Sequence, residues 1–325
     1  MHYILNEYVL FIFKIITITI IPIILLFITK NKYKKNTTNI HIENINNKYI
    51  LLQKKLLNHI YEKNEKKIYI KKLTNDYKKL IKYSKQNLFI INFNNDLNAS
   101  DIINLKDIIS TIILISKKND EVLLKLTSGG GFINNYGLAA SQFKRLKEKN
   151  ITLTISIDLI AASGGYLIAS VANKIIASQF AIIGSIGVIG IIPNIKKLLN
   201  NNNIEIEHHT AGEYKNTLSM VGENTEKGRK KFIESLNDAH TLFKQFIKDN
   251  RPILHIDKVS TGEYWYGKNA LKLNLIDKIQ TSDEYIFNKI NNIKIYEIKI
   301  NKPLTFKQKI TNEIKKSLFN NNIIL

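Results

Sequence analysis

The 325-residue chain contains no cysteine, and arginine, proline and glycine are scarce. The absence of cysteine excludes disulfide bonds and thiolate metal sites. Only three residues are arginine, whereas 45 are lysine, and the formal net charge is +21. Because arginine supplies the planar fork that pairs with phosphates and base edges, a dedicated nucleic-acid binder rarely avoids it this strongly. We therefore expect no nucleic-acid partner, and the heavy use of lysine, isoleucine and asparagine indicates a coding bias toward A and T.

Charged residues are almost absent from the first long apolar run, Tyr8–Thr29, in which Lys14 is the only one. A run of 22 residues is long enough to cross a hydrocarbon core as a helix. Lys14 lies near one end, where its side chain can reach the interface. A cleaved signal peptide needs small residues after the apolar run, and Thr29-Lys30-Asn31 offers none. We therefore expect residues 1–29 to be an uncleaved transmembrane anchor in contact with membrane lipid through residues 8–29.

Residues 30–86 contain no glycine or proline and are strongly basic, with 16 lysines and four acidic residues between positions 30 and 85. Their apolar residues follow helical spacing only in patches. We expect a solvated basic stalk beside the membrane, attracted to anionic lipid headgroups. No chemistry is expected there.

From Asn87 onward the pattern becomes that of an alternating α/β domain. Apolar runs predict strands at residues 87–93, 121–127, 151–158 and 173–180. Helical periodicity predicts helices at residues 101–115, with Ser100 as the cap, at 135–149 and at 226–249. We expect the catalytic domain to span residues 87–288 and a basic tail to span residues 289–325.

Nine of the 14 glycines lie between Gly129 and Gly190, around a single serine in the stretch AASGGYLIAS. Gly129-Gly130-Gly131 follows a predicted strand, where backbone N–H groups can face a ligand without a Cβ in the way. The phosphate-loop pattern is absent. Ser163 follows the next strand at the start of a helix, so it fits either a nucleophile on a tight turn or an ordinary helix cap.

A serine nucleophile needs a base, and no histidine is well placed for that role by sequence pattern. His208 and His209 lie in a polar segment, His240 on the polar side of a predicted helix, and His255 in a predicted loop. A Ser-His-Asp triad is therefore disfavoured. A lysine can serve as the base when burial favours its neutral form. Spacing alone cannot select one of 45 lysines.

Four segments, LTSGGG, DLIAASGGYLIAS, FAIIGSIGVIG and HTAGEYKNTL, resemble the signal peptide peptidase A family of serine proteases, in particular its SohB branch. The resemblance extends from about Phe89 to Ile286. It implies an α/β fold of the Clp protease and crotonase type, built from repeated β-β-α units. It also implies a Ser–Lys dyad, with Ser163 as the nucleophile and Lys215 as the base. The oxyanion hole is implied at the backbone N–H groups of Gly130 and Gly164, and Ser185 is implied as a support for the lysine.

The same resemblance implies no metal and no cofactor. The partners that it implies are peptide or protein substrates, hydrophobic or membrane-derived peptides such as signal peptides among them, and further copies of the chain in a homo-oligomer. It implies a single-pass location in a bacterial inner membrane. The 16 lysines after the anchor favour the cytoplasmic face, whereas the relatives usually work on the outer face, so the side of the membrane stays open.

One departure from the family pattern is Gly129, which replaces the proline of the usual Ser-Pro-Gly-Gly. Losing proline raises the entropy cost of ordering the loop by a few tenths to about 1 kcal/mol, so we expect a softer loop that keeps its donor. Two other functions fit the sequence less well. One is a crotonase-type enzyme acting on acyl-CoA, and the other is a membrane scaffold that kept the fold without activity.

Overall fold

The computed structural model describes residues 6, 8–19, 40–94 and 102–300 of the chain. The chain divides into two compact units, one of residues 1–40 with 300–325 and one of residues 41–299. In the first unit, residues 8–19 form a helix with exposed side chains. Among the described residues, no helix is both long and apolar enough to cross a membrane. Residues 20–29 of the expected anchor lie outside the described residues, so the structure gives no support to the transmembrane helix.

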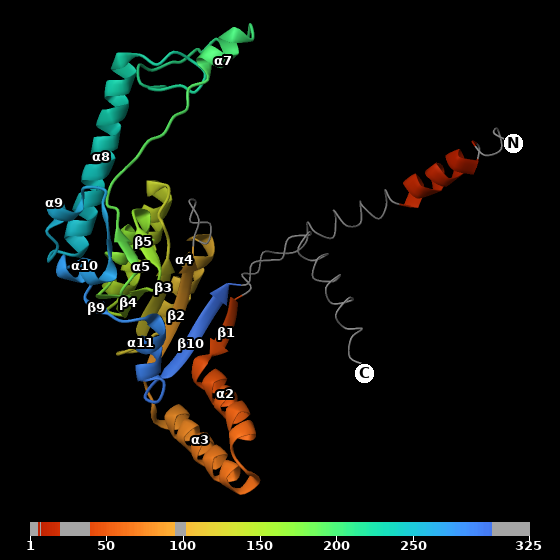
Figure 1. The fold of residues 1–325 in the computed structure, drawn as a ribbon, viewed down its shortest axis with the longest axis vertical. Coiled ribbons are helices and arrows are strands. Elements are labelled where there is room, and N and C mark those ends of the chain that lie inside the picture. Colours follow the sequence, from red (N-terminus) through yellow and green to blue (C-terminus); the bar gives the residue numbers. More distant parts are fainter. Residues whose placement is uncertain (1–5, 7, 20–39, 95–101, 301–325) are drawn as a thin grey trace. The chain divides into compact units, whose positions relative to one another are not determined.

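The second unit is an α/β structure centred on a seven-stranded sheet in the order β1-β10-β2-β3-β4-β6-β9 (Figure 1). From β10 to β9 each neighbouring pair is parallel. The α/β class is confirmed, and so are the strands expected at residues 87–93, 121–127, 151–158 and 173–180. The strands are β1 (Ile40–Asn44), β2 (Asn87–Asn94), β3 (Glu121–Thr127), β4 (Thr152–Ile157), β6 (Lys174–Ala177), β9 (Lys278–Ile279) and β10 (Lys294–Ile300).

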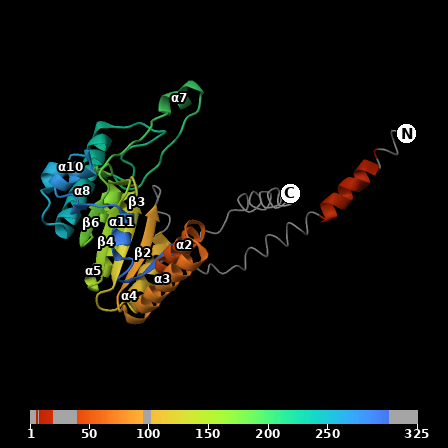
Figure 2. The same cartoon turned by 60° about the horizontal axis from the view of Figure 1, so that its bottom comes forward.

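Parallel strands need crossover connections, and two helices provide those between β2, β3 and β4. Helix α4 (Ile102–Ile115) joins β2 to β3, and α5 (Ile133–Glu148) joins β3 to β4, confirming the helices expected at residues 101–115 and 135–149. The two helices contact each other beside the sheet (Figure 2). The central strands carry nearly uninterrupted apolar side chains because they are buried on both faces. Ser100, the expected cap of α4, lies outside the described residues.

A second sheet of three short strands, in the order β5-β7-β8, lies at the end of β3. Strand β5 (Ile160–Ala162) is parallel to β7 (Ile182–Gly184), and β7 is antiparallel to β8 (Tyr264–Tyr266). An isolated bridge between Ser128 and Ala161 joins this sheet to the chain that follows β3. Helix α6 (Gly164–Ala169) begins directly after β5. The turn from β5 into α6 is therefore held by hydrogen-bonded chain on both sides.

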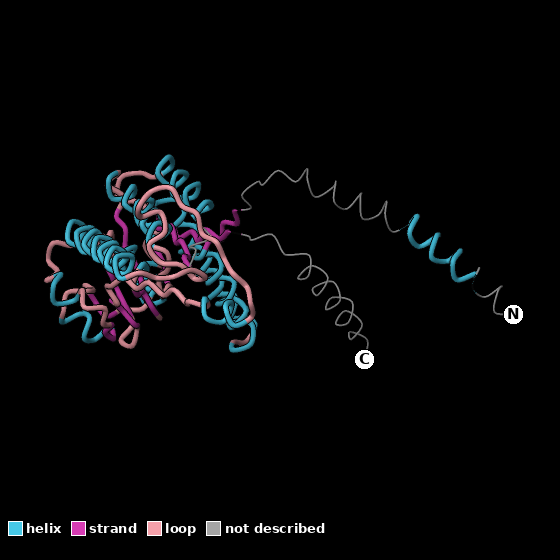
Figure 3. The backbone as a smooth tube through the Cα atoms, turned by 90° about the horizontal axis from the view of Figure 1, so that it is seen from above, coloured by secondary structure: helices cyan, strands magenta, loops and turns pink. Residues whose placement is uncertain are grey.

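Residues 185–225, which we call the arm, join β7 to the long helix α8 (Glu226–Asn250) and contain only the short helix α7 (Lys196–Asn201). The arm consists largely of loops, drawn in pink in Figure 3, and in Figure 1 it extends with the start of α8 away from the strands. Thr225 caps α8 by accepting a hydrogen bond from the Gly228 N–H at 3.1 Å. The helix expected at residues 226–249 is confirmed.

The boundaries of the second unit differ from those expected for the catalytic domain, because strands on both sides of residues 87–288 join its sheet. Strand β10 comes from the expected basic tail, and β1 from the expected stalk. The stalk continues into α2 (Ile45–Ile60) and α3 (Lys63–Tyr83). The short helices that complete this unit are α9 (Ile256–Val259), α10 (Gly267–Lys272) and α11 (Ser282–Lys289).

Asn46, which is 2% exposed, ties the first turn of α2 to the start of β10. Its amide nitrogen donates to the carbonyls of Ile290 at 2.7 Å and Ile293 at 3.0 Å. Its amide oxygen accepts from the Ile295 N–H at 2.8 Å. One side chain thus satisfies three backbone groups that lie more than 240 residues away in sequence.

We expect Asn46→Ala to lower the free energy of unfolding by about 2–4 kcal/mol, since buried backbone groups that lose their partners cost about 1–3 kcal/mol each. Urea unfolding of the full-length protein in detergent measures the change. Asn47→Ala removes a neighbouring exposed side chain and serves as the control. Equal midpoints for the two variants would show that the Asn46 bonds contribute nothing to stability.

Candidate active site

Ser163 lies at the turn between β5 and α6 in a backbone conformation that side chains rarely adopt, with φ 53° and ψ −121°. A positive φ at a non-glycine residue is costly and is concentrated at functional sites. Its side chain makes no capping hydrogen bond to α6, and its backbone lacks the extended conformation of an N-cap residue. The geometry therefore does not support Ser163 as a helix cap. It resembles the sharp strand-to-helix turn that presents a nucleophilic serine.

The neighbouring strand holds this turn in place and brings Ser185 next to it. The Ser163 N–H donates to the Gly184 carbonyl at 2.8 Å, and Ala162 is paired with Gly184 in the parallel register. Ser185 follows directly, also with a positive φ of 49°, and its N–H donates to the Glu263 carbonyl at 2.6 Å. Two serines in strained turns thus end adjacent parallel strands.

The loop after β3 packs its backbone directly against the Ser163 turn. A Cβ on Gly130 would lie 2.7 Å from the Gly164 nitrogen and 2.8 Å from both the Ala162 oxygen and the Ser163 Cβ. Gly130 also has a φ of +91°, which favours glycine. The structure therefore brings the backbones of Gly130, Gly164 and Ser185 close to Ser163.

The backbone N–H groups near Ser163 differ in whether they already donate a hydrogen bond. The Gly130 N–H already donates to Ser128 Oγ at 3.1 Å. The Gly164 N–H begins α6 and has no partner among the described residues, and the same holds for the N–H of Gly131. Gly131 is thus a further candidate oxyanion donor that the sequence analysis did not single out.

Beneath the loop that follows β3 lies a buried pair of hydroxyl groups that the sequence did not predict. Ser128 Oγ lies 2.6 Å from the Tyr136 hydroxyl, and Tyr136 is fully buried. The ring of Tyr136 packs against Gly164, where a Cβ would lie 2.5 Å from the ring carbon Cγ. The Ser128 hydroxyl therefore links the loop backbone to the helix beneath the site. Sequence spacing carries no signal for this pairing, because Tyr136 reads as an ordinary core residue of α5.

Lys215 is not brought to Ser163 by contacts within the chain. It lies in the arm and is exposed, and its amine has no hydrogen-bond or ion-pair partner among the described residues. Its neighbour Glu213 pairs with Lys227, and the Thr217 carbonyl packs on Gly228, so this part of the arm rests on the first turns of α8. The buried contacts of α8 at Phe243 and Ile247 lie at the other end of the helix.

The histidines lie outside this cluster. His208 and His209 are exposed and bond to Asn216 at 3.3 Å and Glu207 at 3.2 Å. His240 is half-buried rather than on the polar side of its helix, and its Nε2 has no partner among the described residues. No group of three or more metal-ligating side chains that could hold a metal ion occurs in the part of the chain that the structure describes.

We expect Gly130→Ala to abolish the reaction of Ser163 with a fluorophosphonate, a reagent for activated serine hydroxyls. The added Cβ would force the loop away from the backbone of Ala162 and Gly164. Gly137→Ala is the matched control, because no atom lies within 4 Å of its Cβ position and alanine favours a helix by about 1 kcal/mol over glycine. Mass spectrometry of the labelled protein measures both. Full labelling of Gly130→Ala would show that the close contact is unnecessary.

Family models match both halves of the chain: the N-terminal domain of peptidase family S49 at residues 3–143 and peptidase family S49 at residues 145–294. A probable protease SohB of Buchnera aphidicola subsp. Schlechtendalia chinensis is 48% identical over 89% of this chain and 100% of the relative. The probable protease SohB of Buchnera aphidicola subsp. Acyrthosiphon pisum is 51% identical over 90% of this chain and 89% of the relative. The probable protease SohB of Haemophilus influenzae is 45% identical over 72% of this chain and 66% of the relative.

Likenesses among solved structures are more distant. The membrane-bound stomatin-specific protease 1510-N matches with a TM-score of 0.41 and 13% identity, over 71% of this chain and 99% of the other. The ClpP protease catalytic domain from Plasmodium falciparum matches with a TM-score of 0.37 and 14% identity, over 59% of this chain and 85% of the other. The family models and the sequence relatives decide the assignment: the chain belongs to peptidase family S49 and is a serine-type protease of the SohB type.

Proposed function

We propose that the chain is a membrane-anchored endopeptidase that cleaves peptide bonds through an acyl-enzyme on Ser163, with Lys215 of a second copy as the base. The observation that carries the proposal is the strained turn at Ser163. It leaves the hydroxyl without a capping bond and lies beside the free Gly164 N–H. A nucleophile next to an unused backbone donor at a helix N-terminus is the arrangement that acyl transfer requires.

In the proposed reaction the Ser163 hydroxyl attacks the peptide carbonyl while neutral Lys215 accepts its proton. The Gly164 N–H and a donor of the Gly130–Gly131 pair hold the developing oxyanion. Each such donor contributes about 2.7–4 kcal/mol in comparable sites. The protonated lysine then gives its proton to the leaving amine, and water hydrolyses the acyl-enzyme. We propose that the Ser185 hydroxyl helps to hold the incoming lysine.

The position of Lys215 supports a base supplied by another copy of the chain. Its segment of the arm rests on Gly228, whereas α8 is buried at Phe243, about 22 Å further along the helix at 1.5 Å per residue. The arm also exposes a set of apolar side chains that a second copy could cover: Ile189, Ile191, Leu198, Ile204 and Ile206. Burial at such an interface would favour the neutral form of the lysine.

The proposed location is the bacterial inner membrane, with residues 8–29 as a single-pass anchor in contact with lipid. The long apolar run in the sequence, in which Lys14 is the only charged residue, supports this assignment. An enzyme tethered there meets hydrophobic and membrane-derived peptides, of which released signal peptides are one class. We propose such peptides as its substrates.

Fluorophosphonate labelling of the full-length protein in detergent tests the nucleophile. Ser163 should be the modified residue, and Ser163→Ala should lose both the label and peptide hydrolysis. Ser141→Ala is the control, because it removes an exposed serine of α5 whose hydroxyl donates to the Gly137 carbonyl, and it should keep a labelled Ser163. Hydrolysis that survives in Ser163→Ala would contradict the proposal.

Mixing two inactive variants tests whether the dyad spans two copies. Ser163→Ala lacks the nucleophile and Lys215→Ala lacks the base, so a mixed oligomer should contain one intact site and regain part of the peptidase activity. Lys215→Arg should not rescue the activity that Lys215→Ala loses, since arginine stays protonated. Fluorescence energy transfer between labelled chains shows whether the subunits have exchanged. If they have exchanged and no activity returns, the dyad lies within one chain.

A further inference from the structure

The hairpin of α2 and α3 buries very little of its own apolar surface. Within the two helices, only Ile45 and Asn46 are buried, and both lie at the end that joins the sheet. At the opposite end, apolar side chains are exposed by 46–69%: Leu56, Ile60, Ile68 and Tyr69. A helix of a soluble protein normally packs its apolar face against another element. In Figure 1 this end of the hairpin projects away from the sheet.

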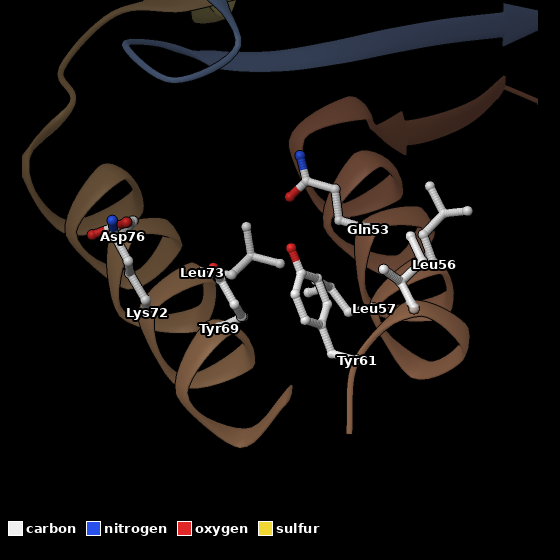
Figure 4. A pocket seen from close by; sticks show the side chains of 9 residues that line it. Gln53, Leu56, Leu57, Tyr61, Tyr69, Lys72, Leu73 and Asp76 are labelled. Carbon is white, nitrogen blue, oxygen red and sulfur yellow. The ribbon is translucent and has the colours of Figure 1, made fainter. Parts of the chain in front are cut away.

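The two helices also leave an apolar groove of about 430 Å³ between them. Figure 4 shows Leu57, Tyr61, Tyr69 and Leu73 projecting into the space between the helices. The rings of Tyr61 and Tyr69 lie 4.7 Å apart across it. A second groove of about 460 Å³ shares Gln53, Leu73 and Asp76 with the first and continues toward α11. The open hairpin thus offers an apolar groove, continued by a groove of mixed polar and apolar lining, that another body can cover.

Charge indicates what that body is. The hairpin, residues 45–83, contains 11 lysines and only three acidic residues, Glu62, Glu65 and Asp76. Lys48 pairs with Glu43 at 3.4 Å, and the other ten lysines have no ion-pair partner among the described residues. Unpaired lysines interspersed with exposed leucine, isoleucine and tyrosine are typical of helices that lie in the interface of an anionic bilayer. A second copy of the same hairpin would bring like charges together.

We propose that the free end of the α2–α3 hairpin binds the surface of an anionic lipid bilayer. Leu56, Ile60, Ile68 and Tyr69 enter the headgroup region, and the lysines contact the lipid phosphates. Only residues 30–39 separate the apolar run 8–29 from β1, a span of about 35 Å at most when fully extended. This contact is separate from the anchor, and it does not rest on the proposed catalytic mechanism.

The absence of cysteine allows a direct test in the full-length protein. Leu56→Cys carries an environment-sensitive fluorophore at the free end, and Leu242→Cys carries it at a 71% exposed position on α8. Both proteins are placed in vesicles of phosphatidylcholine alone or mixed with phosphatidylglycerol. The fluorophore at position 56 should shift to the blue and be quenched by lipid-borne quenchers only in the anionic vesicles. The fluorophore at position 242 should not respond.

Replacing Lys63, Lys67 and Lys71 with glutamine should weaken binding of the hairpin to the anionic vesicles by about a hundredfold, since each lysine near an anionic surface contributes about fivefold. Replacing the same three with arginine keeps the charge and should keep the response. Fluorophosphonate labelling of Ser163 should be unchanged in all variants. Three results would overturn the proposal. The fluorophore at position 56 could respond equally in neutral vesicles, or it could become buried without lipid as the protein concentration rises. It could also become buried when polyglutamate is added without lipid.

Discussion

The contact between the Gly130 backbone and the turn at Ser163 is the constraint on which the rest of the site depends. Atoms of Ala162, Ser163 and Gly164 lie where a Cβ of residue 130 would be, so three chain segments meet without side chains between them. Gly165 continues the contact, because its Cβ would lie 2.5 Å from the Ser128 carbonyl oxygen. The density of small residues around one serine therefore follows from backbone-to-backbone packing. Larger residues would separate the nucleophile from the donors.

The loop that carries these donors is ordered by hydrogen bonds of the Ser128 hydroxyl. Gly129 is exposed, and only the Ile160 side chain lies as near as 4.0 Å to its Cβ position, so the fold leaves room there for a larger residue. The Ser128 hydroxyl accepts from the Gly130 N–H and pairs with the buried Tyr136 hydroxyl. These bonds oppose the extra chain entropy that glycine brings to the loop. They also direct the Gly130 N–H inward and leave the Gly131 N–H free.

Local patterns in the sequence were enough to locate the central strands, α4, α5, α8 and the neighbourhood of Ser163. Strands β2 and β3 are uninterrupted apolar runs, and Ser163 lies among residues whose smallness is itself unusual in this chain. Strand β10 was missed because residues 289–325 were interpreted from their basic composition, although the alternation in Lys294–Ile300 is typical of a half-buried strand. The bonds of Asn46 join segments more than 240 residues apart, and no periodicity reports such pairing. Periodicity also does not report which side chains meet in space, so the Ser128–Tyr136 pair and the projection of the arm could not be predicted.

The proposed dyad joins two parts of the chain that differ in how firmly they are held. Ser163 lies between hydrogen-bonded strands and a buried helix, so its position is determined by the core of its own chain. Lys215 lies in an exposed arm that rests on the first turns of α8 and exposes several isoleucines. If another copy supplies the base, an isolated chain has a nucleophile without a base and a lysine that is exposed to water. Assembly would then complete the site and desolvate the lysine in the same step, so that proteolysis depends on the association of the chains.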